Sequence, residues 1–126
     1  MQYKIYLLAS CSTNKKILKE VNPGPYFQFQ DIKTEGILPE QLDEMKEKTG
    51  SYEALFSRNA LKYRTMGLNN ISLTEADYRR LILEEYTFLK RPVFWVGDSL
   101  FVGNAPKTIA ALKAAIATHE AQNKAS

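Results

Sequence analysis

The spacing of hydrophobic residues predicts a strand, a helix and a second strand near the start of the chain. Residues 3–8 (YKIYLL) form a short apolar, aromatic-rich run that is typical of a buried strand. From Asn14 to Val21 apolar positions recur at helical spacing, and the turn sequence NPGP follows at 22–25. Residues 26–32 (YFQFQDI) then alternate aromatic and polar side chains, as in a strand. These elements form a βαβ unit, whose two strands we expect to be parallel.

The middle of the chain shows helical spacing, with helix-terminal residues at the ends of the segments. We predict a helix that begins at Pro39 and ends at Gly50. Thr74 and Asp77 have the spacing of a capping box, which predicts the start of another helix. Residues 39–86 are therefore expected to form a helical segment.

The last part of the chain returns to strands and then to a helix. Residues 91–103 (RPVFWVGDSLFVG) contain two apolar runs joined by Gly97-Asp98, a pair suited to a tight hairpin turn. A final helix is predicted from Pro106. The polar chain from His119 onward is expected to fray.

The order of these elements predicts an α/β protein with a thioredoxin-like fold. A parallel βαβ pair followed by an antiparallel hairpin and a terminal helix is the core plan of that fold, with a four-stranded mixed sheet. The helices at about residues 39–86 would be an insertion into this plan. We predict a single domain over residues 1–120, which is long enough to bury a core, and a polar tail at 121–126.

Composition and charge exclude several classes of function for this protein. The net charge is only +3 and the basic residues lie among acidic ones, so direct nucleic-acid binding is not expected. No apolar run approaches the roughly 20 residues that cross a bilayer, and no secretory signal is evident, so we expect a cytoplasmic protein. A single cysteine excludes an internal disulfide. One cysteine and one histidine do not make a zinc site, and no bound metal or cofactor is expected.

Cys11 is the only cysteine, and its position leaves two interpretations open. It lies between the first predicted strand and the first predicted helix, flanked by Ser10 and Ser12. The N–H groups at a helix N-terminus favour an anion, which would make Cys11 a thiolate nucleophile, with Lys15 as a nearby cation. A lone cysteine is also commonly a small buried apolar residue. Both readings stand at this point.

Four segments together resemble the arsenate reductase ArsC family. They are IYLLASCSTNKKIL (5–18), FQDIKTEGILPEQLDEM (29–45), LFSRNALKYRTMGLN (55–69) and LTEADYRRLILEEYTFLKRPVFWVGDSLFVGNAPKTIAAL (73–112). The resemblance extends over residues 3 to about 116, and CSTNK and KRPV are its most specific pieces. It implies a thioredoxin-like core with a helical insertion.

The resemblance also implies roles for individual residues. Cys11 matches the nucleophile of the family's arsenate reductases, and Arg91 matches one of the arginines that bind the oxyanion. Pro92 matches a proline that is characteristically cis and packs beside the cysteine. Lys15 stands where the active-site loop carries a basic residue. Such reductases use glutathione and glutaredoxin to resolve the cysteine adduct.

This sequence departs from the family pattern at several positions. Ser57 aligns with a second family arginine, with Arg58 as its neighbour, and Asn104 aligns with a third. Each lost arginine removes charge-assisted hydrogen bonds of about 1.5–3 kcal/mol from an oxyanion site. Asn14 occupies the second position of the Cys-x-x-Cys switch of the related Spx-type regulators, so an internal dithiol switch is impossible.

Two functional hypotheses follow from the sequence. In the first, Cys11 and Arg91 act on a small disulfide or oxyanion substrate such as arsenate, with glutathione or glutaredoxin as partner. The supporting anion-binding residues would be Ser12, Thr13, Asn14, Lys15, Arg58 and Asn104. In the second, the chain is a non-catalytic Spx-like regulator that binds a subunit of RNA polymerase.

Overall fold

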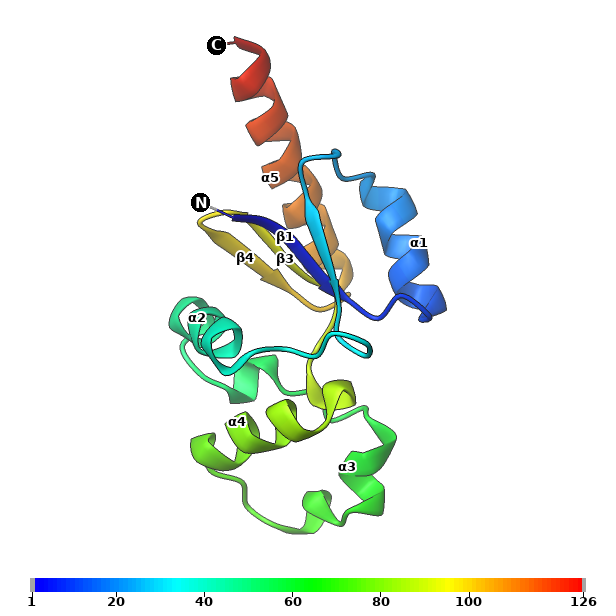
Figure 1. The fold of residues 1–126 in the computed structure, drawn as a ribbon, viewed down its shortest axis with the longest axis vertical. Helices are drawn as coiled ribbons and strands as arrows, with labels where there is room; N and C mark the ends of the chain where they lie inside the picture. The colour runs from blue at the N-terminus through cyan, green and yellow to red at the C-terminus, as the bar shows by residue number, and fades with distance from the viewer. Residues whose placement is uncertain (1, 126) are drawn as a thin grey trace. The chain divides into compact units, whose positions relative to one another are not determined.

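A computed structural model describes residues 2–125, and it places the strands in one mixed sheet (Figure 1). The strands are β1 (Gln2–Leu7), β2 (Gln28–Asp31), β3 (Val93–Gly97) and β4 (Ser99–Val102), in the order β2-β1-β3-β4. β1 pairs parallel with β2 and antiparallel with β3, and β3 pairs antiparallel with β4. The predicted α/β fold with a four-stranded mixed sheet is thus confirmed.

The chain divides into two compact units. The first contains the sheet and comprises the residues up to Asp31 and those from Arg91 onward. The second is the helical segment Ile32–Lys90. Its helices are α2 (Pro39–Thr49), α3 (Leu61–Thr65) and α4 (Glu75–Glu84), with short 3₁₀ helices at Glu53–Leu55, Leu68–Asn70 and Tyr86–Phe88.

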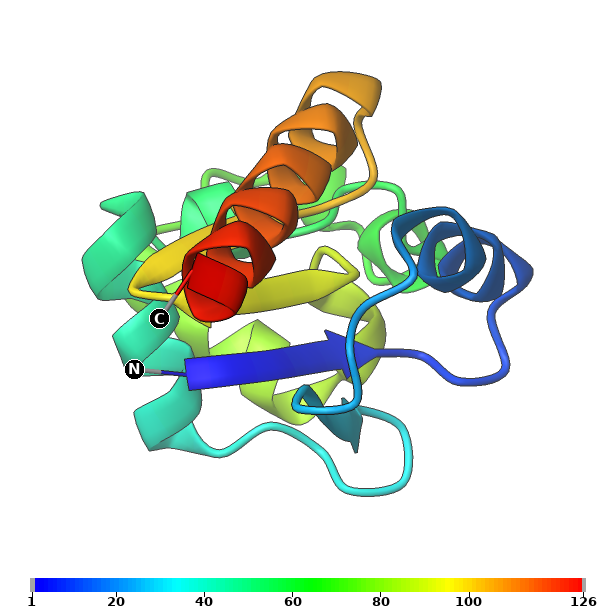
Figure 2. The same cartoon turned by 90° about the horizontal axis from the view of Figure 1, so that it is seen from above.

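Two helices cover one face of the sheet in the first unit, α1 (Ser12–Val21) and α5 (Pro106–Ala125). Figure 2 shows α5 crossing over the strands. Because side chains alternate along a strand, Ile5 and Phe94 point to the face that these helices cover. They are fully buried there and belong to one apolar cluster with Ile17 of α1 and Leu112 of α5. This cluster positions the two helices against that face of the sheet.

The second unit confirms the helix boundaries read from its terminal residues. α2 begins at Pro39, and Gly50 follows it with φ 89°, a left-handed conformation in which glycine is unstrained. At the start of α4, the Asp77 N–H donates to the Thr74 hydroxyl, and the Thr74 N–H donates to the Asp77 carboxylate. The predicted capping box is therefore present.

The expected fraying from His119 onward is wrong. α5 continues to Ala125, and His119 and Glu120 within it contact aromatic residues of the same unit. The Tyr3 hydroxyl lies 3.0 Å from Nδ1 of His119, and the two rings are 4.4 Å apart. Tyr26 donates a hydrogen bond to Glu120 over 3.2 Å. No helix within residues 2–125 combines the length and apolar character needed to span a membrane.

Candidate functional site

The loop between β1 and α1 presents Cys11, and it is closed by two hydrogen bonds. The Cys11 N–H donates to the Leu8 carbonyl over 2.9 Å. The Leu8 N–H in turn donates to the side-chain oxygen of Asn14 over 2.8 Å. Asn14 is only 2% exposed, so its amide acts as a buried brace between the helix and the loop.

Cys11 is the N-cap residue of α1. Its backbone is extended, with φ −82° and ψ 122°, and its carbonyl accepts the first helical hydrogen bond from the Lys15 N–H over 3.1 Å. The side chain is partly exposed and makes no capping hydrogen bond. The thiol is therefore accessible to a reactant at the helix N-terminus, where the N–H groups of the first turn have no partner within the helix.

The surroundings of Cys11 lower the pKa of its thiol. Partial burial raises the pKa, since it removes water from the charged form. The backbone N–H groups of Asn14 and Thr13 act in the opposite direction, as do the charge of Arg91 and the hydroxyl of Thr13. Together they outweigh burial and favour the thiolate, which is the nucleophilic form of cysteine.

Arg91 reaches the Cys11 loop because of the sheet topology. β3 is antiparallel to β1, with Val93 paired to Tyr6, so the start of β3 lies beside the end of β1. Arg91 lies two residues before Val93, the first residue of β3, and is therefore brought to the loop that follows β1. The Arg91–Pro92 peptide bond is cis, the isomer that the sequence resemblance implied.

The structure assigns different surroundings to the other candidates on α1. Ser12, Thr13 and Lys15 are exposed at the start of the helix. Arg91 is the cation among the main groups that lower the pKa of Cys11, and Lys15 is not one of these main groups. The side chain of Asn14 is occupied by the loop, and it is the backbone N–H of Asn14 that acts on Cys11.

Arg58 and Asn104 lie in different units. Arg58 belongs to the helical unit, where its guanidinium donates to Glu53 over 2.6 Å and to the Tyr78 hydroxyl over 3.0 Å. The charge of Arg58 is therefore already compensated by Glu53 within the helical unit. Asn104 belongs to the sheet unit and lines a cavity together with Thr13.

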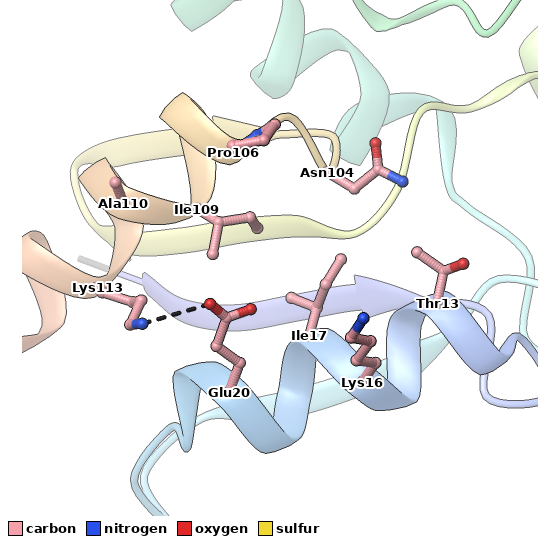
Figure 3. Close-up of a pocket in the computed structure, with 9 residues that line it drawn as sticks. All are labelled: Thr13, Lys16, Ile17, Glu20, Asn104, Pro106, Ile109, Ala110 and Lys113. Carbon is pink, nitrogen blue, oxygen red and sulfur yellow. Dashed lines mark hydrogen bonds and ion pairs between the residues drawn. The ribbon is translucent and has the colours of Figure 1, made fainter.

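This cavity lies between α1 and the start of α5 (Figure 3). It has a volume of about 360 Å³ and is lined in part by two lysines, Lys16 and Lys113. We did not predict it from the sequence. The only signal was the spacing of Thr13, Lys16, Ile17 and Glu20, which puts them on one face of a helix.

Within residues 2–125, no group of three or more His, Cys, Asp or Glu side chains is arranged to hold a metal ion.

Asn14 provides a test of the loop. An Asn14→Ala variant is expected to lose about 1–3 kcal/mol of unfolding free energy, because the Leu8 N–H loses its acceptor. Its Cys11 should also alkylate with altered kinetics, since the loop that positions the sulfur is released. Urea unfolding and alkylation measure the two effects. The exposed neighbour Ser12→Ala is the control, with an expected change within about 0.5 kcal/mol, and equal stability of both variants would contradict the brace.

The fold and site define a class of protein: a thioredoxin-like α/β protein with one thiol at the N-terminus of its first helix. Comparison with family models identifies the family, since the ArsC family model matches residues 6–112. The chain belongs to the ArsC family. A comparison with curated protein sequences gave no match.

Several solved structures are similar to the chain. The YFFB (PA3664) protein is 29% identical with a TM-score of 0.72, covering 88% of this chain and 98% of its own. An arsenate reductase (ArsC) related protein from Brucella melitensis is also 29% identical, with a TM-score of 0.62 and coverage of 88% and 93%. An arsenate reductase from Vibrio cholerae is 18% identical with a TM-score of 0.73, covering 89% and 98%, a likeness of fold.

Proposed function

We propose that this protein is a thiol oxidoreductase in which Cys11 is the single nucleophile and Arg91 stabilises its thiolate. The observation that carries the proposal is the lowered pKa of a partly exposed thiol. Two backbone N–H groups at the helix N-terminus and a guanidinium produce this shift against the effect of burial. A buried structural cysteine has the opposite combination of poor access and a raised pKa.

The reaction that suits one thiol is disulfide exchange. The Cys11 thiolate attacks one sulfur of a small disulfide, a new bond forms between Cys11 and that sulfur, and the second sulfur leaves as a thiolate. A thiol such as glutathione, alone or through a glutaredoxin, then attacks the mixed disulfide. That step releases the Cys11 thiolate and leaves the glutathione oxidised, so each disulfide bond broken is matched by one formed. The cycle needs no second cysteine, which this chain lacks.

A small disulfide is favoured over arsenate as substrate. The arsenate reductases that the chain resembles bind a multiply charged oxyanion with several arginines. Here Asn104 and Ser57 replace two of them, and Arg58 beside Ser57 is engaged by Glu53. Arg91 suffices to stabilise one thiolate charge, whereas an oxyanion of higher charge loses about 1.5–3 kcal/mol with each missing charged hydrogen bond.

The proposal is tested by glutathione-coupled turnover. We expect the wild-type protein to reduce a small disulfide, such as bis(2-hydroxyethyl) disulfide, with excess glutathione and a glutaredoxin, and to accumulate a mixed disulfide at Cys11 when both glutathione and the glutaredoxin are left out. A Cys11→Ser variant should fall to the rate of glutathione and the glutaredoxin without this protein, and should form no mixed disulfide, because its hydroxyl forms no S–S bond.

A parallel assay with arsenate compares the two substrates. Arsenate turnover that exceeds disulfide turnover would overturn the choice of substrate. A second outcome would favour the Spx-like regulator over the oxidoreductase. In that outcome neither disulfide nor arsenate is turned over in a Cys11-dependent way, and the wild-type and Cys11→Ser proteins both capture RNA polymerase.

A further inference from the structure

Three residues at intervals of four form one ridge along α1. Cys11 is the N-cap residue, Lys15 follows four residues later, and Lys19 four residues after that. Residues four apart are neighbours on a helix surface, so the sulfur and the two ammonium groups follow one line. At a rise of about 1.5 Å per residue, Lys15 lies about 6 Å and Lys19 about 12 Å along the helix from Cys11. Cys11, Lys15 and Lys19 together form what we call the lysine ridge.

The two lysines of the ridge are exposed and have no ion-pair partner in the part of the chain that the structure describes. The acidic residue of α1, Glu20, is instead paired with Lys113 of α5. The first turn of α1 contains no acidic residue. A positively charged surface therefore extends from the thiol along about two turns of the helix.

The stability of α1 does not explain these lysines. Like charges four residues apart on a helix repel each other. The N-terminal end of a helix carries a partial positive charge, which disfavours a cation such as Lys15. The thiolate does not account for Lys15 either, because Arg91 is the cation among the main groups that act on Cys11. A contact with another molecule explains the ridge better than a role within the fold.

Charge complementarity indicates what kind of molecule this is. A ligand that follows the ridge needs a sulfur at Cys11 and carboxylates at Lys15 and Lys19. In an extended peptide alternate side chains point to the same side, and two residues span about 6.6 Å. Carboxylates two and four residues from a cysteine therefore match the spacing of the ridge. A small disulfide does not reach Lys19, and a nucleic acid has no sulfur and would lose few counterions to two cations.

We propose that the lysine ridge docks an acidic segment of a protein that exchanges a disulfide with Cys11. The segment lies extended along α1, with Asp or Glu side chains two and four residues from its own cysteine. Leu18, three residues after Lys15 and only partly buried, gives the segment an apolar contact beside the ridge.

This partner rests on the proposed thiol chemistry. The Cys11 thiolate attacks the partner's sulfur within a disulfide, a new S–S bond forms between them, and the other sulfur of that disulfide leaves as a thiolate. The lysines take no part in bond making. They raise the rate at which the acidic segment arrives and keep it in place, so their effect depends on the charge of the partner.

Two peptide disulfides of equal length test the proposal. Each peptide has nine residues with cysteine at the centre. One has glutamate two and four residues away on both sides and alanine elsewhere, and the other has glutamine in place of glutamate. The symmetric disulfide of each is mixed with the wild-type protein, and the Cys11–peptide disulfide is measured by mass spectrometry after acid quenching. Each rate is divided by that of the same disulfide with 2-mercaptoethanol, which corrects for intrinsic reactivity.

We expect the glutamate peptide to react at least about fivefold faster than the glutamine peptide at an ionic strength of 0.01 M. The preference should fall below about twofold at 1 M, where the screening length is about 3 Å instead of about 30 Å. A Lys15→Gln/Lys19→Gln variant should lose the preference at low salt. The matched control, Lys48→Gln/Arg64→Gln, removes two exposed charges of the helical unit and should keep it.

Three results would overturn the proposal. The first is no preference for the glutamate peptide in the wild-type protein, and the second is an equal loss of preference in the two double variants. The third is that Lys15→Gln/Lys19→Gln slows the reaction with bis(2-hydroxyethyl) disulfide as much as the reaction with the glutamate peptide, which would place the lysines at the chemistry rather than at the partner.

Failure of the proposed function gives a different result, in which Cys11 forms a mixed disulfide with neither peptide nor the small disulfide. Docking is then measured by binding alone, with the Cys11→Ser protein and peptides that have serine at the centre. The glutamate peptide should bind more tightly and shift the amide signals of α1 in nuclear magnetic resonance spectra, and equal affinities would overturn the proposal. Tighter binding of pentathymidylate, which has the same number of negative charges, would replace the protein partner with a nucleic acid.

Discussion

An Arg91→Ala variant is expected to react with a small disulfide about three- to tenfold more slowly than the wild-type protein near neutral pH. Among the main groups that lower the pKa of Cys11, Arg91 is the charged side chain, and the others are the N–H groups and hydroxyl of the first helical turn. A charge that acts across a partly solvated site is worth on the order of 1 kcal/mol, and each 1.4 kcal/mol is about tenfold in rate. Stopped-flow measurement of mixed-disulfide formation gives the rate directly.

The comparison variants are Arg91→Lys and Lys15→Ala. Arg91→Lys keeps the charge but loses the planar guanidinium, so we expect an intermediate rate. Lys15→Ala removes an exposed cation four residues from Cys11 that is not among the main causes of the pKa shift, and its rate should stay within about twofold of wild type. If Lys15→Ala slows the reaction as much as Arg91→Ala, Arg91 is not the stabilising cation.

Replacing Phe94 with Ala is expected to cost about 3–5 kcal/mol of unfolding free energy, the largest stability effect that we predict. Phe94 is fully buried on β3, and its ring packs against Phe27 with ring centres 6.1 Å apart. It belongs to the apolar cluster that joins the sheet to α1 and α5. Truncation leaves a cavity at the centre of that cluster, and urea unfolding measures its cost.

The control for this substitution is Phe29→Ala on β2, where the same side chain is 53% exposed. It should cost less than about 1 kcal/mol, because little apolar surface is removed from the interior. If Phe94→Ala fails to fold, Phe94→Leu, which keeps most of the volume, should fold with a smaller loss. Equal stability of the Phe29 and Phe94 alanine variants would contradict the assigned core.

Local patterns were enough to predict the strands and the helices α1, α2, α4 and α5, but not the short helix α3. The hairpin at Gly97-Asp98 and the capping box at Thr74 depend on a few neighbouring residues, and both are present. The position of Cys11 at the start of α1 follows from the strand and helix on either side of it. The fraying expected at His119 was wrong, because the partners Tyr3 and Tyr26 are distant in sequence and polar composition does not reveal them.

Residues of the site that are far apart in the sequence could be predicted to lie together only from the family resemblance. Arg91 is brought to Cys11 by the pairing of β1 with β3, which no local pattern contains. Lys15 and Lys16 are adjacent and equally basic, and only the position of α5 makes Lys16 the one that lines the cavity. The brace made by Asn14 depends on the exact path of the loop back to Leu8, which residue type alone does not define.

The pH dependence of Cys11 alkylation by iodoacetamide tests the central claim most directly. The thiolate is the reacting form, so the rate rises as pH passes the pKa of the thiol. Because the N–H groups of Asn14 and Thr13 and the charge of Arg91 lower that pKa, we expect a midpoint below about 8.5, the value of a free cysteine, and an upward shift in Arg91→Ala. A wild-type midpoint at or above about 8.5 would show an unactivated thiol and contradict the account.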